Sequence, residues 1–268
     1  MATSNPAFSN SPAFTQNATK AIQFSQTPSA EQLDELYGRP AATAEQTDRM
    51  TYENTIQKIV GSFAVLLVAA AVGWFVPLLA IPAAIAGFVV SLVLIFKKKP
   101  SAPLTLAYAG LEGLFVGGIS AIFSNLYEGI VPQAVFGTLA VVGVTLFLFM
   151  SGKVRASKRA TKIFLVAMIG YAAFSLVNLG LMVFGVTDGP FGLRSIEFLG
   201  LPLGFWLGIL VVLLAAYSLV LDFDSIKTGV ERGAPAAFGW TAAFGVMVTV
   251  VWLYVEILRL LAILRGSE

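Results

Sequence analysis

The residues of this sequence that could do chemistry are a few charged side chains set inside long apolar segments. The chain contains no cysteine and no histidine. This composition excludes disulfides, thiol nucleophiles, the usual general base, and the commonest zinc and haem ligands. Five charged residues lie within apolar segments or at their ends: Glu112, Asp222, Asp224, Glu256 and Arg259. Because a charge at the centre of a membrane-spanning helix costs about 2.5–3.5 kcal/mol on insertion scales, a charged residue inside a span should face the bundle interior and have a partner.

The spacing of these charges indicates which of them point inward. Glu256 and Arg259 are three residues apart and share one helix face, where Arg259 can neutralise Glu256 or extend outward to headgroups. Asp222 and Asp224 are about 200° apart around a helix, so only one of them can face the interior. We expect Asp222 to be that residue and Asp224 to cap the helix end or meet headgroups. The inward acids, Glu112 included, either carry a function or fix helix packing through buried pairs.

The elements that must position these residues are membrane spans. Hydrophobic residues make up 57% of the 268-residue chain and charged residues only 12%, about half the charged fraction of a soluble protein. A span needs about 20 mostly apolar residues. Seven segments qualify: Ile59–Val76, Leu78–Phe96, Leu104–Phe123, Ile130–Met150, Lys162–Val186, Leu203–Leu221 and Trp240–Leu264. The sequence therefore predicts an all-α membrane protein built as a seven-transmembrane-helix bundle.

Basic residues lie in alternate loops. Lys97–Lys99 follow span two, five basic residues lie between positions 153 and 162, and Lys227 and Arg232 follow span six. The other loops contain three acidic residues and one base, Arg194. By the positive-inside rule, the N-terminus is cytoplasmic and the C-terminus lies outside. Since the basic residues follow topology, we expect no nucleic-acid partner.

Small residues recur four apart in two spans. Gly113 and Gly117 lie in span three, and Gly200, Gly204 and Gly208 lie at the start of span six. In a bilayer, such positions let helix backbones approach closely. We therefore expect these glycines to serve packing.

Residues 1–55 differ in kind from the rest, and we take residues 56–268 as the transmembrane domain. The first segment is polar and poor in aliphatic residues, so it is expected to be a disordered cytoplasmic tail. It contains a short repeat, Asn-Pro-Ala-Phe at 5–8 and Ser-Pro-Ala-Phe at 11–14. The repeat is either incidental or a docking motif for a partner. No cleavable signal peptide is visible.

Three segments resemble the motifs of one family. Leu-Asp-Phe-Asp-Ser-Ile at 221–226 resembles the Asp-Thr-Gln-x-Ile segment that closes the sixth span in the Bax inhibitor-1 superfamily. Leu-Tyr-Val-Glu-Ile-Leu-Arg at 253–259 is similar to that family's Leu-Tyr-x-Asp-x-x-Asn on the last span. Ala-Gly-Leu-Glu-Gly at 109–113 looks like its Glu-Gly signature. The resemblance covers about 56–268, and the tail suggests an actinobacterial-type branch.

The resemblance implies a bundle with the last helix central and a proton-sharing carboxylate pair that closes a pore. By position, the pair is Asp222 and Glu256. Members are described as pH-sensitive calcium-leak proteins and, in bacteria, as modulators of a membrane AAA protease. The chain departs from the motifs at Glu256 (Asp in the family), Asp224 (Gln) and Arg259 (Asn), and about ten extra residues lengthen the loop at 229–239. An arginine beside the pair would favour two ionised carboxylates and raise the barrier to a cation.

The chemistry of such a pair follows from electrostatics. Two nearby carboxylates in a low dielectric cannot both ionise cheaply, so they share a proton whose release depends on pH. Deprotonation would separate Asp222 and Glu256 and offer oxygen ligands of the kind that Ca²⁺ prefers. Glu112, Asp224 and Arg259 would support this site. We expect no bound cofactor, with Ca²⁺ as a permeant ion.

These observations predict a Bax inhibitor-1-type, multi-pass protein of the bacterial plasma membrane that is a pH-sensitive calcium or cation leak. The alternative is a non-conducting regulator whose tail engages a membrane protease. A proton-coupled transporter is favoured less, because the two halves show no internal repeat with broken helices. An enzyme is favoured least, because no nucleophile and base are suitably combined.

Overall fold

The computed structural model describes residues 48–187 and 191–266, and within these ranges seven helices are long and apolar enough to cross a membrane. They are α4 (Tyr52–Phe75), α5 (Ala80–Phe96), α6 (Ala102–Leu126), α7 (Ile130–Met150), α8 (Lys158–Val183), α9 (Leu203–Glu231) and α10 (Gly239–Arg265). Short 3-10 turns lie at Pro77–Leu79, Gly192–Ser195 and Ala236–Phe238. Two-residue strands β1 (Glu197–Phe198) and β2 (Leu201–Pro202) pair antiparallel. The predicted all-α, seven-helix fold is confirmed.

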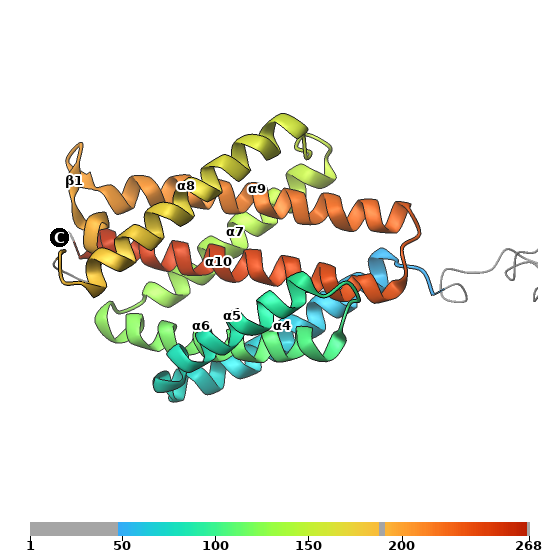
Figure 1. Ribbon diagram of the computed structural model, residues 1–268, viewed down its shortest axis with the longest axis horizontal. Coiled ribbons are helices and arrows are strands. Elements are labelled where there is room, and N and C mark those ends of the chain that lie inside the picture. The colour runs from blue at the N-terminus through green and yellow to red at the C-terminus, as the bar shows by residue number, and fades with distance from the viewer. Residues whose placement is uncertain (1–47, 188–190, 267–268) are drawn as a thin grey trace, which may run out of the picture. The chain divides into compact units, whose positions relative to one another are not determined.

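The helices run back and forth between two ends of the bundle (Figure 1). One end, called here the basic end, contains the start of α4 and the connections 97–101, 151–157 and 232–238. Its connections include Lys97–Lys99, Lys153 and Arg155. The opposite end, called the far end, contains connections 76–79 and 127–129, the described part of 184–202 and the end of α10. In Figure 1, the basic end is on the right and the far end on the left.

The last helix is the centre of the bundle. α10 packs against α4, α6, α7 and α9, and it runs through the middle of the view in Figure 1. In its most apolar window 61% of the residues are buried, against 39% or less for each other span. Leu253, Leu258 and Ala262 are fully buried in the largest core cluster. The expectation that the last helix is central is therefore confirmed.

Glycines bring α4 and α6 into close contact. A β-carbon at Gly113 would overlap the carbonyl oxygen of Leu66, and one at Gly117 would overlap the carbonyl oxygen of Ala70. Only glycine permits this approach, which is a common means of helix association in lipid. Gly204 and Gly208 of α9 likewise lie against side chains of α10.

The spacing of Gly200 from Gly204 suggested a helix contact, but Gly200 lies in a turn before the helix. It lies between β1 and β2 with φ +77° and has open space around its Cα. A positive φ is readily adopted by glycine. Gly200 therefore serves the turn before α9 rather than a helix contact.

The lengthened loop before α10 holds the segment that leads into α4. The backbone N–H of Met50 donates to the Ala234 carbonyl at 2.7 Å, and the N–H of Ala236 donates to the Asp48 carbonyl at 2.8 Å. The Lys58 ammonium donates to the Ala236 carbonyl at 2.5 Å. We call this set of contacts the clasp. It gives the extra residues at 229–239 a structural role at the basic end.

In the described part of the chain, the first helix begins before residue 56, the start of the expected transmembrane domain. Thr51 and Asn54 form a capping box at the start of α4, which satisfies amide groups that a helix start leaves unpaired. Helix α4 therefore begins at Tyr52. The rest of the expected tail, with the Pro-Ala-Phe repeat, lies in residues 1–47, outside the described residues.

The sixth span does not end at Asp222 and Asp224. α9 continues to Glu231, where Lys227 and Glu231 form an i,i+4 ion pair at 3.7 Å. The helix stops just before Gly233, whose φ is +62°. Asp224 therefore lies inside the helix and does not cap its end. The apolar stretch ends at Leu221, but the helix continues for ten more residues, because a helix can extend beyond the membrane with polar side chains.

Candidate functional site

A cavity of about 520 Å³ lies among α5, α6, α9 and α10. Two carboxylates line it, Glu112 from α6 and Asp222 from α9, and the hydroxyls of Ser91, Tyr108 and Thr249 add polar groups. Apolar and aromatic side chains make up the rest of the wall. No lysine or arginine is among the lining residues. The cavity thus brings together two acids without a basic partner in its wall, and we call it the acid cavity.

Asp222 is fixed against the central helix. The Thr249 hydroxyl donates to its Oδ2 at 2.7 Å, and Thr249 itself lies 3.2 Å from the Ser218 hydroxyl. Because Thr249 has only one hydroxyl hydrogen, Ser218 is the donor in the second bond. A β-carbon at Gly245 would come within 3.3 Å of Oδ1. The glycine leaves room for the carboxylate beside α10.

Glu112 is placed by its own helix and by α5. The Tyr108 hydroxyl, one turn earlier on α6, is its hydrogen-bond partner. A β-carbon at Gly87 would lie 3.6 Å from Oε1, so the carboxylate passes close to the backbone of α5. The Tyr108 ring packs edge-on against Phe244, with centroids 5.0 Å apart. These contacts link α5, α6 and α10 around the acid cavity.

A second cluster surrounds Glu256, which is only 3% exposed. Arg259 forms a 2.8 Å ion pair with its Oε1, as the i,i+3 spacing predicts, and Tyr171 donates a hydrogen bond to the same oxygen. Arg194, from the connection between α8 and α9, places a guanidinium nitrogen 3.9 Å from Oε2. One buried carboxylate thus meets two arginines, and we call this group the arginine cluster.

Arg194 reaches the bundle interior although it belongs to a loop. It is 5% exposed, and its Nη2 donates to Tyr171 at 3.0 Å and to Ser175 at 3.1 Å. Its guanidinium also lies over the rings of Tyr171 and Phe174. In the sequence, Arg194 stands out only as the single base of an acidic loop. Its position as the only base among acidic residues was the one hint of an unusual role, because its partner Glu256 lies far away in the sequence.

A family model described as Bax inhibitor 1 like matches residues 5–266. The chain belongs to this family. No curated protein gives a significant match. The match to the Bax inhibitor 1-like family extends into the N-terminal tail, beyond the region from residue 56 that the motifs covered. Two of the motifs lie on α6 and α9, and both of these helices pack against α10, which carries the third motif.

The two acids that the Bax inhibitor-1 motifs pair have separate partners in the structure. Asp222 contacts Thr249, which precedes Glu256 by seven residues on α10, or two turns and about 10 Å of helix rise. Glu256 belongs to the arginine cluster instead. The acid that shares a cavity with Asp222 is Glu112, while Asp224 does not line that cavity. A proton shared between Asp222 and Glu256 stays a prediction.

The acid cavity offers few ligands for a tightly held metal. Within residues 48–187 and 191–266, no three His, Cys, Asp or Glu side chains group together. A high-affinity Ca²⁺ site takes six to eight oxygens. Two carboxylates and a few hydroxyls fit a weakly held cation or an exchanging proton better.

Proposed function

We propose that this Bax inhibitor 1-like membrane protein is a pH-sensitive cation leak whose ion and proton site is the acid cavity. The observation that carries the proposal is the meeting of Glu112 and Asp222 in one cavity whose wall contains no basic residue. Two acids at such a site either share protons or attract a cation. Calcium is the permeant ion that the family resemblance implies.

The sign of the pH effect follows from the carboxylates. When both are ionised, the acid cavity carries two negative charges and attracts a cation. Protonation at lower pH neutralises them and removes that attraction. Since the chain has no histidine, carboxylates are the natural sensors near neutral pH. We expect flux to rise with pH.

The arginine cluster forms a barrier to cations between the acid cavity and the far end. Glu256 contributes one negative charge and Arg194 and Arg259 two positive charges. A net positive group in a low-dielectric region repels cations. A cation moving from the acid cavity toward the far end would meet this group, so the structure fits a closed state.

The test is Ca²⁺ flux into proteoliposomes between about pH 6 and 8. The wild type should show flux that rises with pH, whereas Asp222→Asn and Glu112→Gln should flatten the curve. Asp224→Asn is the matched control, because it changes an acid two residues away on α9 that does not line the acid cavity. Glu256→Gln tests the pair implied by the family motifs. Identical, pH-independent traces for all variants would refute the proposal.

A second candidate is a non-conducting regulator that acts through its tail on a membrane protease. The clasp favours it, because the clasp holds residues 48–50, which follow the tail in sequence, against the connection before α10. Deleting residues 1–47 leaves the clasp intact and separates the two functions. Loss of the cellular phenotype with normal Ca²⁺ flux supports the regulator, whereas a phenotype and a Ca²⁺ flux that both survive the deletion support the leak.

We also propose that the N-terminus faces the cytoplasm of a bacterial cell, as the basic loops predict.

A further inference from the structure

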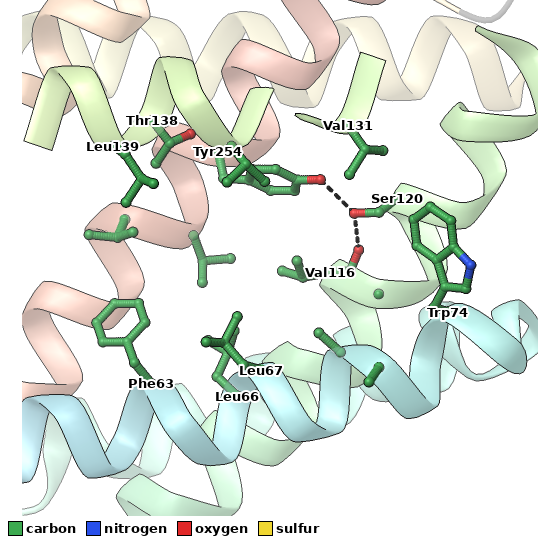
Figure 2. Close-up of a pocket in the computed structure, with 16 residues that line it drawn as sticks. Phe63, Leu66, Leu67, Trp74, Val116, Ser120, Val131, Thr138, Leu139 and Tyr254 are labelled. Carbon is green, nitrogen blue, oxygen red and sulfur yellow. Dashed lines mark hydrogen bonds between the residues drawn. The ribbon is translucent and has the colours of Figure 1, made fainter. Parts of the chain in front are cut away.

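A second cavity, of about 430 Å³, lies between α4 and α7 with α6 and α10 as its floor (Figure 2). α4 and α7 both pack on α10, but they make no substantial contact with each other in the described part of the chain. The cavity therefore occupies a gap between two helices at the bundle surface. Leu67 on one wall and Leu139 on the other are 66% and 61% exposed, so the gap opens sideways. We call it the lateral groove.

The polar groups of the lateral groove satisfy one another. Ser120 donates to the Val116 carbonyl at 2.5 Å and lies 2.6 Å from the Tyr254 hydroxyl, which must then be the donor. Thr138 donates to the Ala134 carbonyl at 2.8 Å. The remaining wall is apolar apart from the Trp74 indole, whose nitrogen points away from the groove in Figure 2. Water needs two or more polar partners to occupy a cavity, so the expected occupant is apolar.

The length of the lateral groove matches one leaflet of a bilayer. Along α4 it extends from Phe63 to Trp74, eleven residues apart, which corresponds to about 16 Å of helix. The hydrocarbon core of a bilayer is about 30 Å thick. Trp74 lies next to the last residue of α4, at the far end, where tryptophan typically meets headgroups.

The chemistry of the groove favours a single lipid chain over a protein segment. Its wall is apolar, and its hydroxyls already hydrogen-bond to one another or to helix carbonyls, so it offers an incoming backbone no free partner. An extended stretch of this protein's own tail would have to start from the basic end and cross half the bilayer. Its unpaired backbone groups would make that course costly.

We propose that the lateral groove binds one acyl chain of a phospholipid from the far-end leaflet, with its headgroup beside Trp74. The chain fills the gap between α4 and α7 and rests on Val251 and Tyr254 of α10. This site does not depend on the proposed leak function. It predicts a lipid that stays with the protein longer than the lipid around the other helices.

The test uses the full-length protein in liposomes that contain a phospholipid with a photoreactive diazirine in the middle of one acyl chain. After illumination, mass spectrometry of peptides locates the labelled residues. Labelling of α4 and α7 at the groove should exceed, several-fold, labelling of the exposed face of α8 around Ile169, which is 70% exposed. Equal labelling of the groove and of α8 would mean only bulk lipid and would overturn the proposal.

Two matched variants sharpen the result. Ala71→Phe places a ring in the lateral groove and should remove the preferential labelling. Ala64→Phe makes the same change at another exposed position of α4 that does not line the groove, and it should keep the preference. If Ala71→Phe fails to elute as a folded protein, Leu139→Trp fills the groove from α7 instead. Preferential labelling that survives in a folded groove-filling variant, or a cross-linked dimer through the groove, contradicts the site.

Discussion

Replacing Arg194 by methionine is a direct test of the arginine cluster. Methionine keeps an apolar stem but removes the charge, the 3.9 Å ion pair with Glu256 and the hydrogen bonds to Tyr171 and Ser175. In membrane proteins, an interhelical hydrogen bond contributes about 0.6 kcal/mol on average and about 1.7 at most. The contacts of the guanidinium with two rings add about 0.5–2 kcal/mol in total. We therefore expect a loss of about 2–4 kcal/mol in the free energy of unfolding.

The comparison of three variants makes this prediction sharp. Arg259→Met should cost less, about 1 kcal/mol, because it removes two hydrogen bonds of average strength from a side chain that is 30% exposed, whereas Arg194 also contacts two rings. Glu256→Gln should cost most, about 3–5 kcal/mol, because it leaves two buried or half-buried arginines without their acid. Lys227→Met is the control, since its ion pair with Glu231 is exposed and should contribute less than about 1 kcal/mol.

The assay is equilibrium unfolding in detergent micelles, followed by circular dichroism and repeated as refolding to establish reversibility. If Arg194→Met unfolds at the same denaturant concentration as the wild type, then Arg194 does not lie inside the bundle in solution. If Arg259→Met costs more than Arg194→Met, the half-buried Arg259 is the main partner of Glu256. Either result would refute the reasoning from burial.

Two further predictions concern packing and the clasp. Gly117→Val should destabilise the bundle by about 1–3 kcal/mol, because its β-carbon would overlap the α4 backbone. Gly143→Ala, with nothing within 4 Å of the added carbon, should instead stabilise by up to about 1 kcal/mol. The same unfolding assay measures both, and equal effects would contradict the close α4–α6 contact. Lys58→Met removes the bond to the Ala236 carbonyl, so hydrogen exchange at the Met50 and Ala236 amides should become faster; unchanged exchange would mean that the lysine does not hold the clasp.

The sequence was sufficient to predict the spans but not their polar extensions. Apolar windows of about 20 residues are a strong signal because lipid requires them. The last turns of α9 are polar, and a helix can continue there on local pairs such as Lys227–Glu231. Likewise, the extra residues at 229–239 read as an open loop, while the structure uses them to hold the entrance of α4.

The partners of the inward acids were harder to predict for a physical reason. The i,i+3 pair of Glu256 and Arg259 depends on helix periodicity alone, and the structure contains it. The neighbours of Asp222 depend on how α6, α9 and α10 pack, which no local pattern encodes. Arg194 is the extreme case, because it approaches Glu256 from a connection that lies 62 residues earlier in the chain.

The positions of the two clusters on α10 lead to a last prediction, which rests on the leak function proposed above. Thr249 and Glu256 are seven residues apart, so they lie on nearly the same face of the helix. A cation that leaves Asp222 along this face would reach the arginine cluster next, which makes the two acids successive positions on one path. Arg194→Met leaves Glu256 paired with Arg259 alone and makes the cluster neutral, so its barrier to a cation should fall. We expect Ca²⁺ flux through this variant to exceed that of the wild type although its fold is less stable. A folded Arg194→Met protein with flux at or below the wild-type level would show that the path does not pass Glu256.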